Sequence, residues 1–459
     1  MIRYGLEYRL DNKKSAMYGV QHMILFIANA AIMPVIIAKG LGLEHAEISD
    51  MLLRTFFLCG VLSIIQMRLG HRYPIIDGPS GLWLTVWISL AAITSSTGGD
   101  LAHLRASLEL GMLISGAIII VLGLSGKMKY ISRLFSPLVN GIFLVLMPIQ
   151  LSMSFVAGMF GTIYGGQVIA PKDFAAFWIT VAAMILINIK GTAFLKSIAI
   201  LIGVAVGWIF ATGVGISDFS DMGSQQSFII LPQPFAWGAP EFDAGILLTC
   251  IIGSFLLFAN VIASFLGTAD VIGEEFTEKQ LNRGTMCFGA ASILTGVFAT
   301  IGFVPFATSM GIIRMTGVAT RKPFYLGSAA MIVLGVIGPV GLFFAAIPPS
   351  VGYGALLVLF AVIIKQGLDN FKKANITETM GFAVGISMLA GTGIMMQPLE
   401  VFEKLPDVIV PFVSNGLLVG VILAIILEQA LRGKGKDGAS DEGEGNAENT
   451  ENAEERNDF

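Results

Sequence analysis

Long apolar runs that contain very little charge limit what this chain can fold into. Of its 459 residues, 55% are hydrophobic and only 13% are charged, whereas soluble domains carry about 25% charged residues. A transmembrane helix needs about 20 mostly apolar residues, and residues 1–430 hold nearly all the apolar content. The sequence therefore predicts an all-α polytopic membrane protein with about 12 to 14 spans.

The positions of lysine and arginine predict how these spans are oriented. We assign fourteen spans to residues 17–38, 47–66, 74–95, 104–125, 131–152, 173–189, 195–213, 243–270, 284–301, 303–319, 323–344, 350–366, 378–393 and 408–430. Both termini then share one face with most of the basic loop residues, and the opposite face carries Lys39, Arg105, Lys172 and Lys404. Because basic residues mark the cytoplasmic side, we expect a cell (plasma or inner) membrane protein with both termini cytoplasmic.

Fourteen spans divide into two halves of seven. Since seven is odd, two related halves must lie in opposite orientations. We therefore expect inverted repeats at residues 17–213 and 243–430, joined by an external loop at 214–242. A cytoplasmic segment, residues 1–16, comes before the first repeat. Residues 431–459 are rich in Gly, Asp, Glu and Asn and predict a disordered acidic cytoplasmic tail.

Glycine and proline interrupt the third span of each half. Residues 74–83 read Pro-Ile-Ile-Asp-Gly-Pro-Ser-Gly-Leu-Trp, and residues 302–311 read Gly-Phe-Val-Pro-Phe-Ala-Thr-Ser-Met-Gly. Each has a short extended stretch, with Pro79 or Pro305, before hydroxyl residues at a helix start. Opposed half-helices would direct two positive dipole ends at one mid-membrane point, which is typical of a transport site. The alternative is that Gly and Pro only kink two ordinary helices.

The second half-helix can be described in more detail. We expect Thr308 or Ser309 as its N-cap and Arg321 near its C-terminal end. Its first N–H groups would lack intrahelical partners and would point into a cavity. Arg314, one to two turns into the helix, is expected to extend toward the cytoplasm rather than to bind a ligand.

Asp77 is the one acid that we place at the depth of the crossing point, immediately before Gly78 and Pro79. A carboxylate within the membrane and without a basic partner is costly, and it can exchange protons. It can equally act as a structural cap that accepts hydrogen bonds from the backbone amides freed around Pro79. Both interpretations stay open on the sequence.

Polar side chains also follow one face of the eighth span. Asn260, Ser264 and Thr268 are each one helical turn apart. An amide with hydroxyl groups suits a neutral ligand rich in donors and acceptors, such as a heterocycle. Interhelical hydrogen bonding is the alternative. Trp83 can stack on a planar ligand, although packing is the commoner use of tryptophan.

The tenth span matches a family signature in its spacing. Members of the nucleobase–ascorbate transporter family, also called nucleobase:cation symporter-2 or xanthine/uracil permeases, carry Asn-x-Gly-x4-Thr-x4-Arg there. In this chain Ser309, Gly311, Thr316 and Arg321 fall at those offsets, with serine in place of asparagine. The chain therefore resembles this family in the span that we predict to be broken.

Two further runs carry the same resemblance. Gln21 and His22 in the first span look like the family's Gly-x-Gln-His, and from the residues alone they either line the cavity or pack between helices. The run from Asp77 to Trp83 is similar to that of the purine permease branch. The resemblance implies fourteen spans in two inverted seven-span repeats, a core domain and a gate domain, and a possible homodimer through the gate.

The chain departs from the family where its members grip the base. Typical members have a glutamate and a histidine or aspartate on span eight, at positions that fall here on Asn260 and Ser264. An acidic or amide residue before the span-ten asparagine falls on Thr308. Because both usual carboxylates are missing, we hypothesise that Asp77 is the proton-coupling group.

We therefore expect a secondary active transporter that imports a purine-like nucleobase, with H⁺ favoured over Na⁺ as the coupling cation and with no cofactor. The residues expected at the substrate are Asn260, Ser264, Thr308, Ser309, Gly311, Gly81 and Trp83, with Asp77 as the proton site. The residues expected to have structural or motif roles are Gln21, His22, Pro79, Pro305, Thr316 and Arg321.

Alternative functions differ in the ligand rather than in the architecture. An anion transporter or channel on the same seven-plus-seven fold would use the two positive helix ends, and a permease for uracil or another nucleobase would use the same polar groups. An enzyme is disfavoured because no mid-membrane cluster of His, Cys and acids is evident. Nothing in the sequence indicates binding to nucleic acid.

Overall fold

The computed structural model describes residues 2–162, 168–217, 219, 227–374, 376–402, 404–406 and 408–431. Part of the predicted external loop and nearly all of the predicted tail, residues 432–459, lie outside the described residues. The first half contains α1 (Asn12–Ala30), α2 (Ile32–Gly40), α3 (His45–Leu69), β1 (Asp77–Pro79), α4 (Gly81–Ser96), α5 (Leu101–Leu124), α6 (Met128–Ser132), α7 (Pro137–Phe160), α8 (Pro171–Lys190), α9 (Ala193–Ser197) and α10 (Ala199–Gly213).

The second half has a similar succession of helices around one short strand. It contains α11 (Ala244–Ile272), α12 (Glu278–Val297), β2 (Phe303–Pro305), α13 (Thr308–Thr316), α14 (Arg321–Leu334), α15 (Gly338–Ala345), α16 (Pro349–Lys373), α17 (Glu378–Met395), a 3-10 turn (Leu399–Phe402), α18 (Val410–Val413) and a last helix, Gly416–Leu431. Each predicted span therefore coincides with one or more of these elements.

Within the described residues, eight helical segments are long and apolar enough to cross a membrane. They comprise α1 together with α2, then α3, α5, α7, α8, α11, α16 and α17. Shorter apolar helices occupy the predicted third, seventh and fourteenth spans, at α4, α10 and Gly416–Leu431. The prediction of a helical polytopic membrane protein is confirmed, and the count of fourteen spans stays a prediction.

The two predicted interruptions are extended, and they pair with each other. β1 and β2 form an antiparallel two-stranded sheet with Asp77 opposite Pro305, Gly78 opposite Val304 and Pro79 opposite Phe303. All six residues are buried. Proline lacks an N–H and cannot continue a helix, so each stretch places its remaining polar backbone groups against the other. Backbone of this kind is tolerated at membrane depth only when protein encloses it.

A half-helix follows each strand, but the second one begins and ends differently from the sequence expectation. Its N-cap is Ala307, without a side-chain hydrogen bond, rather than Thr308 or Ser309. The helix ends at Thr316, where Gly317 has a φ of 68°, a left-handed conformation that suits glycine. Arg321 is therefore the first residue of α14 rather than the end of this helix.

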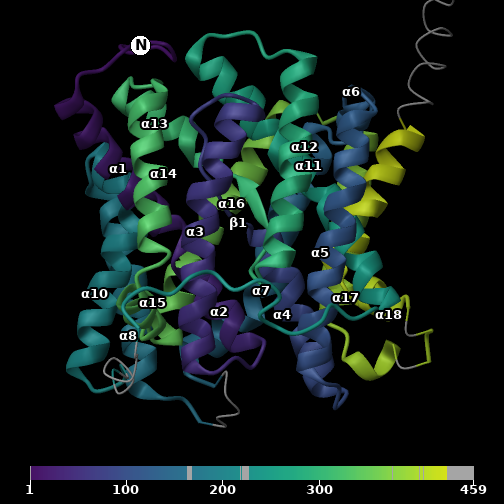
Figure 1. Ribbon diagram of the computed structural model, residues 1–459. Coiled ribbons are helices and arrows are strands. Elements are labelled where there is room, and N and C mark those ends of the chain that lie inside the picture. The colour runs from purple at the N-terminus through teal and green to yellow at the C-terminus, as the bar shows by residue number, and fades with distance from the viewer. Residues whose placement is uncertain are drawn as a thin grey trace, which may run out of the picture.

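The helices pack in two sets around the crossing of β1 and β2. In one set α5 packs on α12, α14 packs on α1 and α3, and α15 packs on α3; in the other, α16 packs on α7 and α8, and α8 packs on α10. Figure 1 shows β1 in the middle of the molecule, where it contacts α3. Gly116 of α5 and Gly289 of α12 face each other, and a Cβ on either would lie 2.6 Å from the other's carbonyl oxygen. Small residues thus permit the closest helix contacts.

Candidate functional site

Backbone hydrogen bonds extend the pairing of the two strands at both ends. The Ser80 amide donates to the Gly302 carbonyl at 3.0 Å, and the Phe306 amide donates to the Ile76 carbonyl at 2.7 Å. The Ile76 amide in turn donates to the Ser309 hydroxyl at 3.0 Å. Ser309, which we expected at the substrate, is only 2% exposed and holds the two strands together.

Two further serines attach the strands to neighbouring helices. The Asp77 amide donates to the hydroxyl of Ser63 on α3 at 3.0 Å. The Ser264 hydroxyl on α11 donates to the Pro305 backbone carbonyl at 2.8 Å and lies 3.5 Å from the side-chain Oδ1 atom of Asn260. Ser264 thus satisfies a strand carbonyl that has no other described partner, which is the interhelical alternative considered for this residue.

The Asp77 side chain is enclosed at the crossing. It is 1% exposed, and its Oδ2 atom has no hydrogen-bond partner among the described residues. Neither a salt bridge nor a side-chain hydrogen bond to a freed amide is recorded for it in the described part of the chain. The capping interpretation therefore has no hydrogen bond to support it, whereas a buried unpaired carboxyl oxygen needs an explanation.

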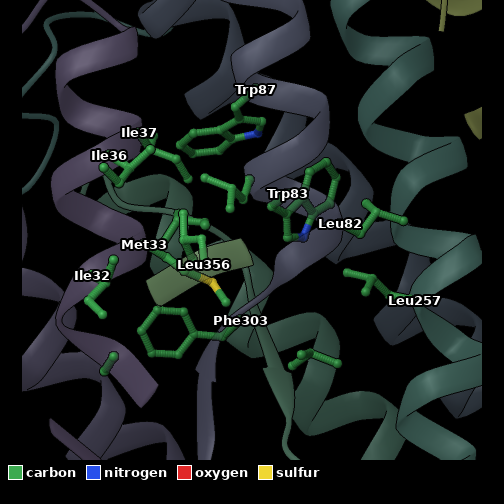
Figure 2. Close-up of a cluster of buried hydrophobic side chains, with 14 of the residues drawn as sticks. Ile32, Met33, Ile36, Ile37, Leu82, Trp83, Trp87, Leu257, Phe303 and Leu356 are labelled. Carbon is green, nitrogen blue, oxygen red and sulfur yellow. The ribbon is translucent and has the colours of Figure 1, made fainter. Parts of the chain in front are cut away.

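Trp83 lies in an apolar cluster on one side of the crossing. Figure 2 shows it beside Leu82 and Trp87, with Phe303 of β2 in the same cluster. Its side chain is 0% exposed, and its Nε1 atom has no described acceptor. A Cβ on Gly302 would lie 2.3 Å from that Nε1 atom. Trp83 therefore packs against the backbone of the tenth predicted span in this structure.

The start of α4 faces the second set of helices. A Cβ on Gly81 would lie 3.3 Å from Cζ of Phe360 on α16 and 3.4 Å from Cε of Met147 on α7. The amides of Gly81, Leu82 and Trp83 have no recorded acceptor among the described residues, as expected for the first turn of a helix. The positive end of this half-helix is thus unneutralised, and aromatic and thioether groups cover it.

The start of α13 has fewer free donors than we expected. The Ser309 amide donates to the Phe306 carbonyl and the Met310 amide donates to the Ala307 carbonyl, both at 3.1 Å. The amide of Thr308, the first of this helix, has no partner among the described residues outside the helix. The expectation that several free N–H groups of α13 point into a cavity is wrong, because tight turn bonds use them.

Exposed polar groups form a stripe along α11 and α13. Thr308, Gly311 and Arg314 recur at every third position of α13 and are exposed, and Asn260 on α11 is half-buried. Beyond them Arg314 Nη2 lies 4.0 Å from Asp270 Oδ2, and both side chains are mostly exposed. We call Asn260, Thr308 and Gly311 the polar stripe; Arg314 and Asp270 lie beyond it. Both side chains are exposed, as expected for Arg314.

The remaining motif residues lie in packing or capping positions. The Thr316 hydroxyl donates to the Ile312 carbonyl at 2.8 Å and accepts from the Val318 amide at 3.2 Å. His22 is 6% exposed and meets Phe324 of α14 edge-on, whereas Gln21 beside it is half-buried. The packing alternative thus describes His22. Pro79 and Pro305 lie in extended stretches as predicted, and the structure pairs these stretches as strands.

Several residues at the crossing were not among our candidates. Ser63 and Phe306 contact β1, since a Cβ on Gly78 would lie 2.7 Å from the Phe306 ring. Gln150 on α7 donates to the Ser89 hydroxyl at 2.9 Å; Ser89 is on α4, which also packs on α5 of the first helix set, so this bond links the two sets. A polar residue within an apolar span was the available signal for Ser63, Ser89 and Gln150. No group of three or more His, Cys, Asp or Glu residues that could hold a metal occurs in the described chain.

Known proteins resemble this chain over most of its length. A model described as "Permease family", that of the xanthine/uracil permeases, matches residues 13–400. The chain is 28% identical over 424 residues to "Putative purine permease YwdJ" of Bacillus subtilis, which covers 91% of this chain and 96% of that protein. It is 24% identical to the xanthine permease of the same organism, over 90% of this chain and 93% of the relative.

A solved structure shares the fold. The transmembrane domain of the cyanobacterial bicarbonate transporter BicA matches with a TM-score of 0.61 and 16% identity, over 93% of this chain and 100% of that domain. At this identity the likeness concerns the fold alone. It agrees with the helical polytopic architecture described above.

Proposed function

We propose, from the premise that this chain belongs to the xanthine/uracil permease family, that it imports purine-like nucleobases as a secondary active transporter. The family consists of permeases, and the chain is not an enzyme. The relatives at 28% and 24% identity are named as purine and xanthine permeases, which supports a purine among the nucleobases. Membership of the family and the polar stripe beside the paired strands together carry the proposal.

The base would bind between the polar stripe and the two half-helix starts. The Asn260 amide supplies a donor and an acceptor, and its Nδ2 atom donates to no other described residue. The Thr308 hydroxyl and the open space beside Gly311, where a Cβ would meet nothing within 4 Å, lie on α13, which packs on α11. A planar heterocycle presents edge donors and acceptors that these groups complement. Ser264 and Ser309 would position this site through the strands, and Gly81 and Trp83 would form its apolar side.

Proton coupling is assigned to Asp77. Its buried Oδ2 atom lacks a partner, and the usual acids of the family are absent at Asn260 and Thr308. A proton taken from outside would neutralise the Asp77 carboxylate before the site opens inward. The neutral carboxyl group costs less free energy in an apolar environment than the charged one. H⁺ is favoured over Na⁺ because one carboxyl oxygen without further ligands is a poor sodium site.

The proposed transporter has fourteen spans in two inverted repeats. It lies in the plasma or inner membrane, with both termini in the cytoplasm. The helix set built on α3, α5, α12 and α14 would be the core domain, and the set built on α7, α8, α10 and α16 would be the gate domain. Rocking of one against the other would expose the site alternately to the two sides. A homodimer through the gate domain completes the proposal.

The decisive experiment is uptake in a host that lacks its own purine transport. Labelled hypoxanthine, guanine, xanthine, urate and uracil are offered at two external pH values, with unlabelled bases as competitors. We expect saturable purine uptake that rises at the lower pH and falls about tenfold in Asn260→Ala, since an unpaired polar edge costs about 1.4 kcal/mol or more. Asn188→Ala is the matched control, because the Asn188 amide bonds only to its own helix, at the Met184 carbonyl.

Three outcomes would contradict the proposal. If no base is taken up although the protein is present in the membrane, an anion transporter becomes the favoured function. Inhibition by small anions would then be tested. Uptake that depends on external Na⁺ and not on pH would support nucleobase transport but exclude proton coupling. Uptake of uracil alone would replace the purine with another base of the same family.

A further inference from the structure

A groove lined by arginines lies at the end of α3, away from the substrate site. It has a volume of about 510 Å³ and is lined by Arg68, Arg72, Arg321, Tyr325 and apolar residues of the last turns of α3. Arg321 is the motif residue that the transport proposal leaves without a role. Its position at the start of α14, rather than at the end of α13, is what brings it to this groove.

The turn after α3 fixes two of the three arginines in place. The amides of Gly70 and Arg72 both donate to the Gln66 carbonyl, at 2.9 Å and 3.3 Å. Arg72 has a φ of 69°, which is uncommon for a residue with a side chain and is found at functional positions. Arg321 donates from Nε to the Arg72 carbonyl at 3.2 Å, so the loop and the start of α14 are held together.

The positive charge of the groove is only partly compensated. Arg321 forms an ion pair with Glu7, whose side chain is 83% exposed. Arg68 and Arg72 are exposed and have no acidic partner within the described residues. Two unpaired guanidinium groups at one end of a membrane helix suit a phosphate, because their fork of donors matches its oxygens.

Apolar side chains continue from the arginines along the outer face of the molecule. Ile64 and Ile65 are half-buried, and Leu69 is 64% exposed. On α14, Leu326 and Val333 are also exposed, at 43% and 56%. This face of two neighbouring helices is apolar enough to contact acyl chains, and Tyr325, a residue type that is enriched at membrane interfaces, lines the groove beside the arginines.

We propose that this groove binds the headgroup of an anionic phospholipid, with the phosphate on Arg68 and Arg72 and an acyl chain along Ile64, Ile65 and Leu69. A free phosphate would use the arginines but would leave the apolar face uncovered. Arg321 keeps the groove in shape through the Arg72 carbonyl and adds a third positive charge. Basic pockets of this kind beside the cytoplasmic ends of spans bind anionic headgroups.

The test measures lipid binding to the purified, delipidated full-length protein in detergent. Phosphatidylglycerol and phosphatidylcholine with identical acyl chains, and inorganic phosphate, are titrated while bound lipid is counted by native mass spectrometry and the melting temperature is followed. The variant is Arg68→Gln with Arg72→Gln. The matched control is Lys190→Gln with Lys196→Gln, which removes two other exposed basic residues without a recorded acidic partner among the described residues.

We expect phosphatidylglycerol to bind and to raise the melting temperature, with phosphatidylcholine much weaker. Each arginine should contribute about fivefold in affinity, which corresponds to about 1 kcal/mol for a basic residue at an anionic surface. The double arginine variant should therefore bind about 25-fold more weakly, and the lysine control should change less than twofold. Equal binding of both lipids, equal effects of the two variants, or full protection by inorganic phosphate would overturn the proposal.

Discussion

At the scale of single residues, Asp77 decides how transport is driven. Its carboxyl group is 1% exposed at the crossing of the strands, and one oxygen has no described partner. Asp77→Asn keeps the size and removes the exchangeable proton, so uptake driven by a pH gradient should fall at least about tenfold. Exchange of labelled for unlabelled base across vesicles without a gradient should persist, because binding does not need that proton.

A matched substitution separates this role from a general effect of charge. Asp270→Asn removes a carboxylate that is 84% exposed and only contacts Arg314 at 4.0 Å, and exposed pairs contribute little. It should leave pH-driven uptake unchanged. If Asp77→Asn retained full pH-driven uptake, the proton would have to travel through another group.

The residue scale also shows what a local pattern conceals. Asn260, Ser264, Thr308 and Ser309 were all predicted as substrate contacts from their polarity and spacing. Ser264 and Ser309 instead bond to backbone groups 41 and 233 positions away in the sequence. Their partners depend on which strand lies beside them, and no local pattern contains that information. Asn260 and Thr308 differ from the two serines because their side chains are at least partly exposed. The exposure of a side chain depends on the folded chain and not on a local sequence pattern.

At the scale of elements, two glycines of the tenth predicted span should behave in opposite ways. Gly302→Ala places a Cβ 2.3 Å from Nε1 of the enclosed Trp83 and 2.6 Å from Cε of Met112. Overpacking of this kind should lower the free energy of unfolding by about 1–3 kcal/mol, visible as a lower melting temperature in detergent. Gly311→Ala meets nothing within 4 Å and should leave stability unchanged while it reduces base uptake.

Comparable melting temperatures for the two variants would show that Trp83 can move away, and that the packing at the crossing is loose.

The extended stretches themselves were predictable, because Pro79 and Pro305 exclude a regular helix on local grounds alone. Their pairing register was not predictable, since it depends on hydrogen bonds between segments more than 200 residues apart. The same cause excludes Ser309 as the N-cap, because its hydroxyl already accepts from the amide of Ile76, the residue before β1.

At the scale of the whole molecule, transport by rocking requires the two helix sets to move against each other. Ser89 on α4 and Gln150 on α7 join them through a 2.9 Å hydrogen bond. With Cys59, Cys250 and Cys287 replaced, a Ser89→Cys and Gln150→Cys pair linked by a short bifunctional thiol reagent should stop uptake, and cleavage of the linker should restore it. A Lys322→Cys and Asn12→Cys pair, whose native side chains meet at 2.7 Å within one set, should link without loss of uptake. Full uptake through a cross-linked Ser89 and Gln150 pair would mean that these two helices move as one body, and the boundary between the moving parts would then have to lie elsewhere.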